Sequence, residues 1–329
     1  MGRFAVRSLL QLLAATFVVS AAVALIGHAR FVAPGPLARD TAIVIPKGGI
    51  GKIARLLAGA GVISDATVFR LAARLTGRDR AMRAGEFLFP AAVSMKGAIS
   101  LLTNGATMKR RLTVAEGLTT AEVLKLIAAT DGLAGDVPPL LDEGVLLPET
   151  YFFSHGDARA DIVGRMRSAM QEAFAELWPQ RAPGGPLKTP AEALILASII
   201  EKETAIDAER ARVSAVFHNR LKKRMRLQSD PTVVYAIASS AGPLHRKLTR
   251  RDLSIDSPYN TYWVRGLPPG PITNPGRASI AAALNPAADD ALYFVADGSG
   301  GHVFARTLAE HNRNVARWRR LQHRRNQNR

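Results

Sequence analysis

Apolar positions follow two different patterns along the chain, and the first is a continuous run near the N-terminus. Residues 9–26 are almost entirely apolar, and Arg3 and Arg7 precede them. About 30 Å of hydrocarbon needs roughly 20 helical residues, so this run predicts a single membrane-spanning helix. A cleaved signal peptide is the alternative, but the following residues 27–31 match a small-x-small cleavage site poorly. The arginines on the short N-terminal side favour a cytoplasmic N-terminus and an exported body.

From residue 41 to about residue 130 the second pattern consists of short strand–turn–helix units. Strands are expected at Thr41–Pro46, Gly85–Phe89 and Arg111–Ala115. A stretch of apolar residues at helical spacing follows each strand. The first stretch begins at Ile50, and the other two end before residues 104 and 130. The units recur too irregularly for a solenoid. Small units of this kind normally bind or scaffold, and none of these residues indicates chemistry.

Beyond a boundary near residues 137–144 the pattern is strongly helical. Thr189-Pro190-Ala191-Glu192 is a capping box with proline at the first helical position, and it predicts a helix from Ala191 to about Thr204. The further elements expected are a helix at 161–178, helices from Asp207 and Asp230, a long loop at 255–276, and a β-hairpin formed by 292–295 and 302–304. The predicted fold class is α+β, with a mainly helical second domain.

Composition narrows the classes of function. The chain is 47% hydrophobic and 22% charged, which is typical of a globular protein and excludes wholesale disorder. It has no cysteine, so disulfides, thiolate metal sites and cysteine nucleophiles are excluded. The seven histidines show no metal-ligand spacing, and we expect neither a metal nor another cofactor.

The net charge of +17 raises the question of an anionic partner. An exported body meets no chromosome, so anionic polymers or a membrane surface are expected instead of nucleic acid. Much of the excess comes from the C-terminal arginines at 306, 313, 317, 319, 320, 324, 325 and 329, with Glu310 the single acid among them. A solvated terminal helix and tail is the simpler account of these arginines.

Two carboxylates end the helix that follows the capping box. Glu201 and Glu203 lie two residues apart, so at 100° per residue they point about 200° apart and cannot form an acid–base pair on one side. Glu203 shares its face with Ile199 and Ile200, and an apolar setting raises the pKa of a carboxyl group towards that of a general acid. Glu203 is therefore the better catalytic candidate. The alternative is an ordinary solvent-facing glutamate near a helix C-terminus.

The loop at 257–265 carries three aromatic residues with amide and hydroxyl groups between them. Aromatic rings with polar tips suit stacking on sugars, although the same residues are equally suited to packing a proline-rich loop onto its domain. A single acid beside an aromatic, amide-lined cleft indicates cleavage of a glycosidic bond.

Several longer motifs carry a family resemblance. They are Leu196–Ala205, Glu209-Arg210, Val216–Leu221, Met225–Thr232, Tyr235, Tyr259–Tyr262, Gly266–Ile272, Asn274–Gly276, Leu284–Pro286, Tyr293–Gly298 and Gly300–His302. In this order they resemble the YceG-like family of endolytic murein transglycosylases. The resemblance covers nearly the whole chain and is dense from residue 143 to residue 318.

The resemblance implies a single-pass inner-membrane protein whose body lies in the periplasm. It implies an anchor at 1–30, a LysM-like domain at 41–130, a catalytic domain at 131–318 and a basic tail at 319–329. The implied reaction is non-hydrolytic cleavage of the MurNAc–GlcNAc bond in nascent peptidoglycan strands, leaving 1,6-anhydro-MurNAc ends and terminating elongation. The family's Glu-Lys-Glu-Thr motif places the catalytic glutamate at Glu203, and the family context suggests peptidoglycan synthases as partners.

Three polar residues are candidates for binding the sugars around Glu203. Gln228, Asn260 and Tyr262 carry groups that orient sugars or stabilise a developing cation, while Gln228 and Asn260 are equally suited to bonding buried backbone. Two other functions remain open. One is a non-catalytic peptidoglycan-binding scaffold of the wall-synthesis complex, and the other is a hydrolase that uses water in place of the sugar hydroxyl.

Overall fold

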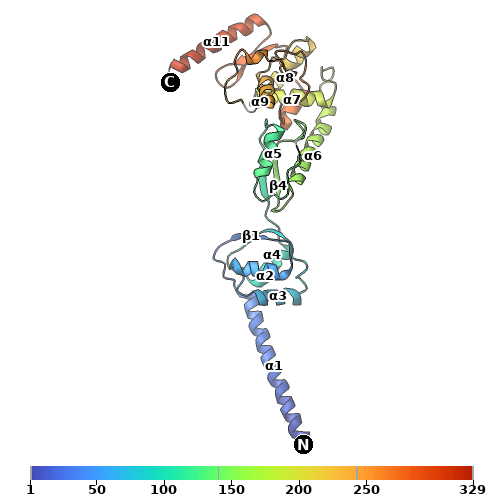
Figure 1. Cartoon of the computed structure of the whole chain (residues 1–329), viewed down its shortest axis with the longest axis vertical. Coiled ribbons are helices and arrows are strands. Elements are labelled where there is room, and N and C mark those ends of the chain that lie inside the picture. Colours follow the sequence, from blue (N-terminus) through green and yellow to red (C-terminus); the bar gives the residue numbers. More distant parts are fainter. Residues whose placement is uncertain (1, 140, 242–243, 328–329) are drawn as a thin grey trace. The chain divides into compact units, whose positions relative to one another are not determined.

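The fold is mixed α+β, as the sequence predicts. A computed structural model describes residues 2–139, 141–241 and 244–327, so Arg329 of the expected basic tail lies outside the described residues. The chain divides into two compact units (Figure 1). The first comprises residues 1–110 and 152–157, and the second comprises residues 111–151 and 158–329.

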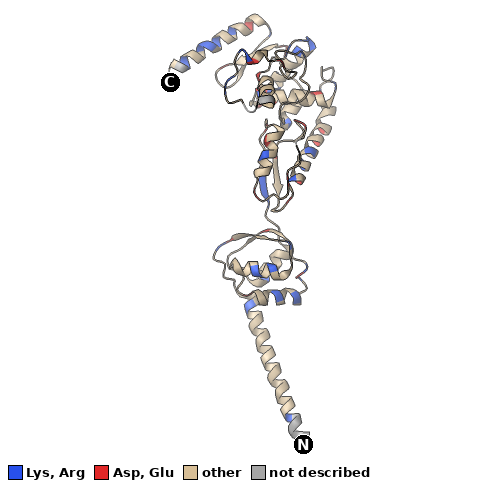
Figure 2. Ribbon diagram, viewed as in Figure 1, with Lys and Arg blue, Asp and Glu red and all other residues tan. Residues whose placement is uncertain are grey.

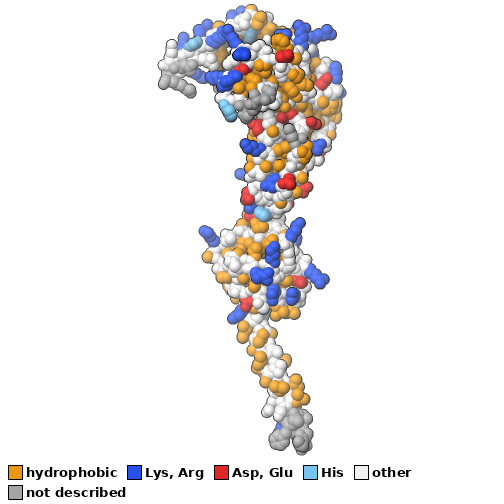
Figure 3. Space-filling model, in the orientation of Figure 1, with side chains coloured by type: hydrophobic (Ala, Val, Ile, Leu, Met, Phe, Trp, Pro, Cys, Tyr) orange, Lys and Arg blue, Asp and Glu red, His pale blue; other side chains and the backbone are white. Residues whose placement is uncertain are grey.

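The first unit begins with α1 (Gly2–Val32), a helix of 31 residues. Its segment from Arg7 to Val32 has 26 residues and is long and apolar enough to cross a membrane. Exposed hydrophobic side chains recur along this helix (Figure 3). The helix extends past the apolar run at 9–26 because residues 27–32 continue it without a break.

The rest of the first unit is a small strand–helix fold. Its elements are β1 (Thr41–Ile45), α2 (Ile50–Gly59), α3 (Ala66–Leu75), β2 (Gly85–Phe89) and α4 (Met95–Asn104). The two strands are antiparallel, with Thr41 opposite Phe89 and Ile45 opposite Gly85. Helix α3 does not figure among the elements expected from sequence. Asp65 caps it, since its Oδ1 accepts from the amides of Thr67 at 2.7 Å and Val68 at 3.1 Å.

The second unit is mainly helical. Two strands, β3 (Arg110–Thr113) and β4 (Thr150–Phe153), cross the boundary between the units. The other elements of the second unit are α5 (Thr120–Ala129), α6 (Arg159–Leu177), η1 (Trp178–Gln180), α7 (Pro190–Glu203), α8 (Asp207–Lys222), α9 (Asp230–Ala241), η2 (Asp252–Ser254), α10 (Arg277–Leu284), β5 (Tyr293–Ala296), β6 (His302–Ala305) and α11 (Leu308–Gln327). β3 pairs with β4, and β5 pairs with β6 as the expected antiparallel hairpin, with Ala296 opposite His302. Helix α10 packs against α7 and α8.

Helix α11 packs against the hairpin and carries the C-terminal arginines. Lys and Arg positions recur along its ribbon in Figure 2. Arg313, Arg317, Arg320 and Arg324 are exposed and are spaced by three or four residues, so they share one face of the helix. The helix continues through residues 319–327, which the sequence suggests to be a basic tail.

The core of the second unit surrounds α7. The predicted capping box is confirmed, since Thr189 Oγ1 accepts from the Glu192 amide at 3.2 Å and Glu192 Oε2 accepts from the Thr189 amide at 3.3 Å. Every residue from Ile195 to Ile200 is buried, so the helix contacts protein on all sides. A helix held in this way fixes the position of its last residue, Glu203.

Candidate active site

Glu203 lies where α7 leaves the core, and its side chain is half-buried. The hydroxyl of Ser229 donates a short hydrogen bond to its Oε1. Burial raises the pKa of Glu203 to about 7, and the Asp230 carboxylate adds to the rise; Ser229, His302 and Arg220 act in the opposite direction. The group can therefore hold a proton at neutral pH and can also release it.

Ser229 is held by a small cluster of buried hydroxyl groups. Its amide donates to Thr261 Oγ1 at 2.9 Å, and its carbonyl accepts from Thr232 Oγ1 at 2.7 Å. The two threonine hydroxyls lie 2.9 Å apart and bond each other. Since Thr261 belongs to the long loop and Thr232 to α9, the cluster ties both elements to the hydroxyl that bonds Glu203.

Two of the predicted sugar-binding residues lie near this carboxyl group. The Tyr262 hydroxyl donates to Asp230 Oδ1 at 2.6 Å, and burial and that carboxylate raise the pKa of Tyr262. Gln228 is exposed and has a positive φ of 51°. Its backbone N–H donates to the Thr261 carbonyl at 3.1 Å. This bond anchors the backbone, while the exposed side chain remains accessible to a ligand.

Asn260, the third predicted sugar-binding residue, is completely buried at 0% exposure. Its amide nitrogen donates to the carbonyls of Leu253 at 3.1 Å and Ile255 at 2.8 Å, and its oxygen accepts from the Tyr262 amide at 2.9 Å. These bonds favour the second role considered for it, which is to satisfy buried backbone and hold the loop.

A buried cation, Arg220, lies beside the site. Its Nε donates to the Leu292 carbonyl at 2.7 Å, its Nη1 donates to the Leu227 carbonyl at 2.7 Å, and its guanidinium lies 5.3 Å from the ring centre of Tyr293. Its charge favours the ionised form of Glu203, while burial lowers its own pKa. Arg220 was not singled out from the sequence. The signal was an arginine continuing the apolar spacing of Val213 and Phe217.

The neighbouring carboxylate, Glu201, has a different role in the fold. Its Oε2 accepts from the Gly276 amide at 2.9 Å, which joins α7 to the start of α10. The hydrogen-bond partners of the two glutamates therefore differ, since Glu203 bonds Ser229 and Glu201 bonds the start of α10.

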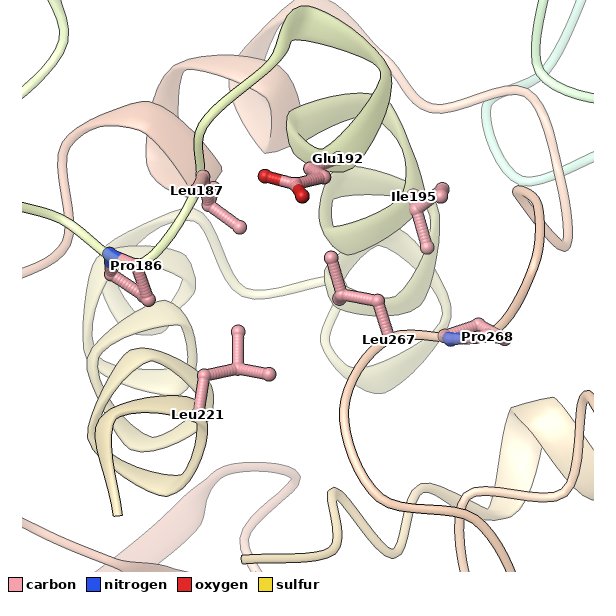
Figure 4. Close-up of a pocket in the computed structure, with 7 residues that line it drawn as sticks. All are labelled: Pro186, Leu187, Glu192, Ile195, Leu221, Leu267 and Pro268. Carbon is pink, nitrogen blue, oxygen red and sulfur yellow. The ribbon is translucent and has the colours of Figure 1, made fainter. Parts of the chain in front are cut away.

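A pocket of about 440 Å³ lies elsewhere in this unit, between α7, α8 and two loops (Figure 4). Its lining is mainly apolar, with Ile195, Leu221 and Leu267 among the contributors. The carboxylate of Glu192 is occupied by the amides of Lys188 and Thr189 at the helix cap. The Glu192 carboxylate in its lining therefore serves the helix cap. Among the described residues, no group of three His, Asp or Glu side chains is placed to hold a metal ion.

A family model covers most of the chain that forms these elements. The model of the YceG-like family matches residues 43–317. The chain belongs to the YceG-like family. An endolytic murein transglycosylase of Bacillus subtilis is 33% identical over 305 residues, covering 82% of each chain. An endolytic murein transglycosylase of Streptococcus pneumoniae is 35% identical over 180 residues, covering 53% of this chain and 32% of its own.

A solved structure of the YceG-like family is also similar. The crystal structure of a yceG-like protein from Listeria monocytogenes matches with a TM-score of 0.50 and 31% identity, covering 84% of this chain and 99% of the other. In the present YceG-like chain, the motif residues Glu203, Gln228 and Tyr262 meet around Ser229 and Asp230. Ser229 itself was not singled out from sequence, because a serine before a helix start is ordinarily read as a turn or cap residue.

Proposed function

We propose that this chain is a lytic transglycosylase that cleaves the MurNAc–GlcNAc bond inside peptidoglycan strands. The observation that carries the proposal is Glu203, a half-buried carboxyl group with a pKa of about 7, fixed at the end of a buried helix. The names of the relatives from Bacillus subtilis and Streptococcus pneumoniae support the same substrate class.

In the first step, protonated Glu203 donates its proton to the glycosidic oxygen. The bond from that oxygen to the MurNAc anomeric carbon breaks, and positive charge develops at the carbon. The Ser229 hydroxyl occupies Oε1 as a donor, so Oε2 is the oxygen placed to carry the transferred proton. After donation, Ser229 and the Arg220 charge stabilise the carboxylate that forms.

In the second step, ionised Glu203 takes the proton of the MurNAc C6 hydroxyl, whose oxygen attacks the anomeric carbon. The products are a 1,6-anhydro-MurNAc end and a free GlcNAc 4-hydroxyl, and Glu203 regains its proton. One carboxyl group suffices because the nucleophile belongs to the substrate, in contrast to the two-carboxylate glycosidases. Gln228 and Tyr262 are proposed to contact the sugars at this site.

The proposal extends to the rest of the chain. Helix α1 acts as a single membrane anchor with the body in the periplasm. The predicted LysM-like segment at 41–130, which runs from the first unit into the second, binds glycan. An anchored enzyme meets nascent strands near the membrane, where peptidoglycan synthases release them. Cleavage there terminates strand elongation.

The test uses the full-length chain in detergent with uncrosslinked glycan strands and mass spectrometry of the products. The parent is expected to produce anhydro-MurNAc ends. Glu203→Gln keeps the shape of the side chain but removes the transferable proton, so it is expected to reduce turnover by at least about 10³-fold. Glu201→Gln is the matched control at the neighbouring carboxylate, and it is expected to retain catalysis.

Each other outcome identifies a different function. Reducing ends in place of anhydro ends would show a hydrolase that uses water. Full activity of Glu203→Gln would place the acid elsewhere. If the parent and the variant both bind the strands but neither cleaves them, the protein is a non-catalytic peptidoglycan-binding scaffold.

A further inference from the structure

The C-terminal arginines of α11 lie on a helix that is fixed along its length to the β5–β6 hairpin. Near the start of the helix, His311 stacks on Tyr293 of β5, with ring centres 5.1 Å apart. Near its end, Arg325 Nη2 donates to the Gly298 carbonyl at 2.6 Å, and a Cβ atom on Gly298 would lie 3.1 Å from the Trp318 ring. The arginines are therefore carried by an ordered, docked helix.

The hairpin beneath α11 is in turn fixed to α8, the helix that follows α7. Glu209 Oε1 accepts from the His302 amide at 2.9 Å, and Glu209 Oε2 lies 2.8 Å from His302 Nδ1. Farther along α8, the ring of Phe217 packs edge-on against that of Phe294, with centres 5.9 Å apart. Both strands of the hairpin thus contact α8, and α11 is held in place relative to the helices that carry Glu203.

Direct contacts join this hairpin to the Glu203 site. The Arg220 guanidinium lies 5.3 Å from the ring centre of Tyr293, the residue on which α11 stacks. Its Nη1 lies 3.5 Å from Gln228 Oε1, and the next residue, Ser229, bonds Glu203. The start of α11 and the Glu203 carboxyl group therefore belong to one continuous set of contacts within the second unit.

Four arginines form a row along the exposed side of α11, which we call the arginine row. Arg313, Arg317, Arg320 and Arg324 are exposed, and the row spans about 16 Å at 1.5 Å per residue. The helix has no Asp or Glu from residue 311 to residue 327. Among the described residues, no carboxylate forms an ion pair with Arg317, Arg320 or Arg324. Like charges at this spacing destabilise a helix, so an anionic partner would relieve the repulsion.

The apolar residues of α11 indicate which kind of anionic partner fits. Within residues 311–327 the large apolar side chains are Val315, Trp318 and Leu321, and all three are half-buried. Trp318 and Leu321 lie against Gly298 of the hairpin turn. A helix that lies in a membrane surface inserts an apolar face into the lipid, whereas this apolar face is already packed on protein. A hydrophilic polyanion therefore fits the arginine row better than a bilayer does.

We propose that the arginine row binds carboxylates of the stem peptides on the peptidoglycan strand that is held at Glu203. Stem peptides are the short peptides attached to the MurNAc lactyl groups, and uncrosslinked ones carry free carboxylates. The inference rests on the proposed function, and it adds an acidic peptide to the part of the substrate that the chain recognises. Exposed guanidinium–carboxylate pairs are individually weak, so the row acts through several pairs and contributes to binding, not to the chemical step.

Strands with and without the peptides test this directly. The full-length chain in detergent is given uncrosslinked strands that carry stem peptides, or the same strands after an amidase has removed the peptides. The glutamine variant, Arg317→Gln/Arg320→Gln/Arg324→Gln, is expected to raise KM for peptide-bearing strands on the order of tenfold at low salt while kcat stays within about twofold of the parent. On bare strands the variant and the parent are expected to match.

Conservative and remote substitutions separate charge from structure. Replacing the same three arginines with lysine keeps the charge and is expected to restore most of the parent's affinity. Added salt is expected to raise the KM of the parent more than that of the glutamine variant, because salt screens exposed pairs. The matched control removes three exposed basic groups elsewhere in the unit, Arg167→Gln/Lys188→Gln/Arg250→Gln, and is expected to match the parent on both substrates.

Three results would overturn the inference. The first is a glutamine variant with the parent's KM on peptide-bearing strands. The second is an equal loss on bare strands, which would mean that the row contacts the sugars or supports the fold. The third is an unchanged KM together with protection of α11 from trypsin in phosphatidylglycerol vesicles but not in phosphatidylcholine vesicles, which would assign the row to a membrane surface.

Failure of the proposed function gives a different result. A parent that forms no anhydro-MurNAc ends contradicts that function, and the arginine row is then tested by binding alone. Fluorescence anisotropy of labelled strands is expected to show that the parent binds peptide-bearing strands more tightly than the glutamine variant does, whether or not cleavage follows. Equal binding by the two would overturn the inference independently of the reaction.

Discussion

At the scale of the residue, the burial that makes Glu203 an acid also destabilises the folded protein. Its pKa rises from 4.5 to about 7 on folding, so the folded state disfavours the ionised form. The penalty is absent below about pH 4, where both states are protonated, grows as the pH rises, and is complete above pH 7. Glu203→Gln is therefore expected to raise the free energy of unfolding at pH 8 by about 1–3 kcal/mol, allowing for partial exposure.

The measurement is urea unfolding of the full-length chain in detergent at pH 8 and at pH 4, where the gain is expected to vanish. Glu172→Gln is the control, since this exposed glutamate of α6 should show no difference at either pH. An equal gain for Glu203→Gln at both pH values would mean that ionisation is not its cause.

Ser229 sets the pH range over which Glu203 works. Its hydroxyl bonds the carboxylate and lowers the pKa of Glu203, so Ser229→Ala should raise that pKa further and move the alkaline limb of kcat/KM to higher pH. Losing a bond to a charged group, worth roughly 1.5–3 kcal/mol, should also lower kcat by about tenfold or more. Ser239→Ala, at an exposed serine of α9, should change neither. An alkaline limb that moves to lower pH would contradict this role.

At the scale of the element, local signals predicted much of the fold. The capping box at Thr189 and the apolar strands flanking the turn at 297–301 each contain their own start and stop signals within a few residues. Helix α3 was missed because its apolar positions are interrupted by arginines, and only the Asp65 cap marks its start. Contacts between residues that are far apart in sequence leave no such local signal.

The same limit applies to the candidate site. Glu203 was found from its helix position and motif, whereas its contact with Ser229 joins residues 26 apart in sequence and that of Glu209 with His302 joins residues 93 apart. A single sequence does not show which distant segments lie in contact. The full burial of Asn260 also depends on tertiary packing, which is why its two roles could not be separated from sequence.

The α7 cap offers a test of how firmly this element holds Glu203. Thr189→Ala removes the hydroxyl that accepts from the Glu192 amide, and it is expected to lower the free energy of unfolding by about 1 kcal/mol. The rest of α7 is held by buried contacts, so the rate per folded molecule should stay within twofold of the parent. Thr189→Ser keeps the hydroxyl and should restore the stability in the same urea titration. A large loss of kcat in Thr189→Ala would show that cap and acid are coupled.

At the scale of the whole molecule, the apolar surface of α1 requires a covering that the rest of the described chain does not supply. None of the residues from Arg7 to Val32 is classed as buried. The C-terminal end of the helix differs, because Phe31 packs on the core of the first unit and Arg30 lies 3.8 Å from Asp65. A chain that begins at residue 28 keeps these contacts and loses the exposed apolar segment. It is expected to be soluble without detergent and to unfold at the same temperature as the parent.

The same truncation separates anchoring from catalysis. The full chain is expected to stay with membranes through an alkaline carbonate wash, as an integral helix does, while the chain from residue 28 is expected in the supernatant. Val19→Asp in the full chain should also weaken retention, since a central carboxylate opposes insertion by about 2.5–3.5 kcal/mol on insertion scales. Because the site is built entirely from residues of the second unit, the truncated chain should cleave soluble strands with kcat/KM within about twofold of the parent. Carbonate extraction of the full chain would contradict the anchor, and a large loss of activity in the truncated chain would show that α1 contributes to catalysis as well as to location.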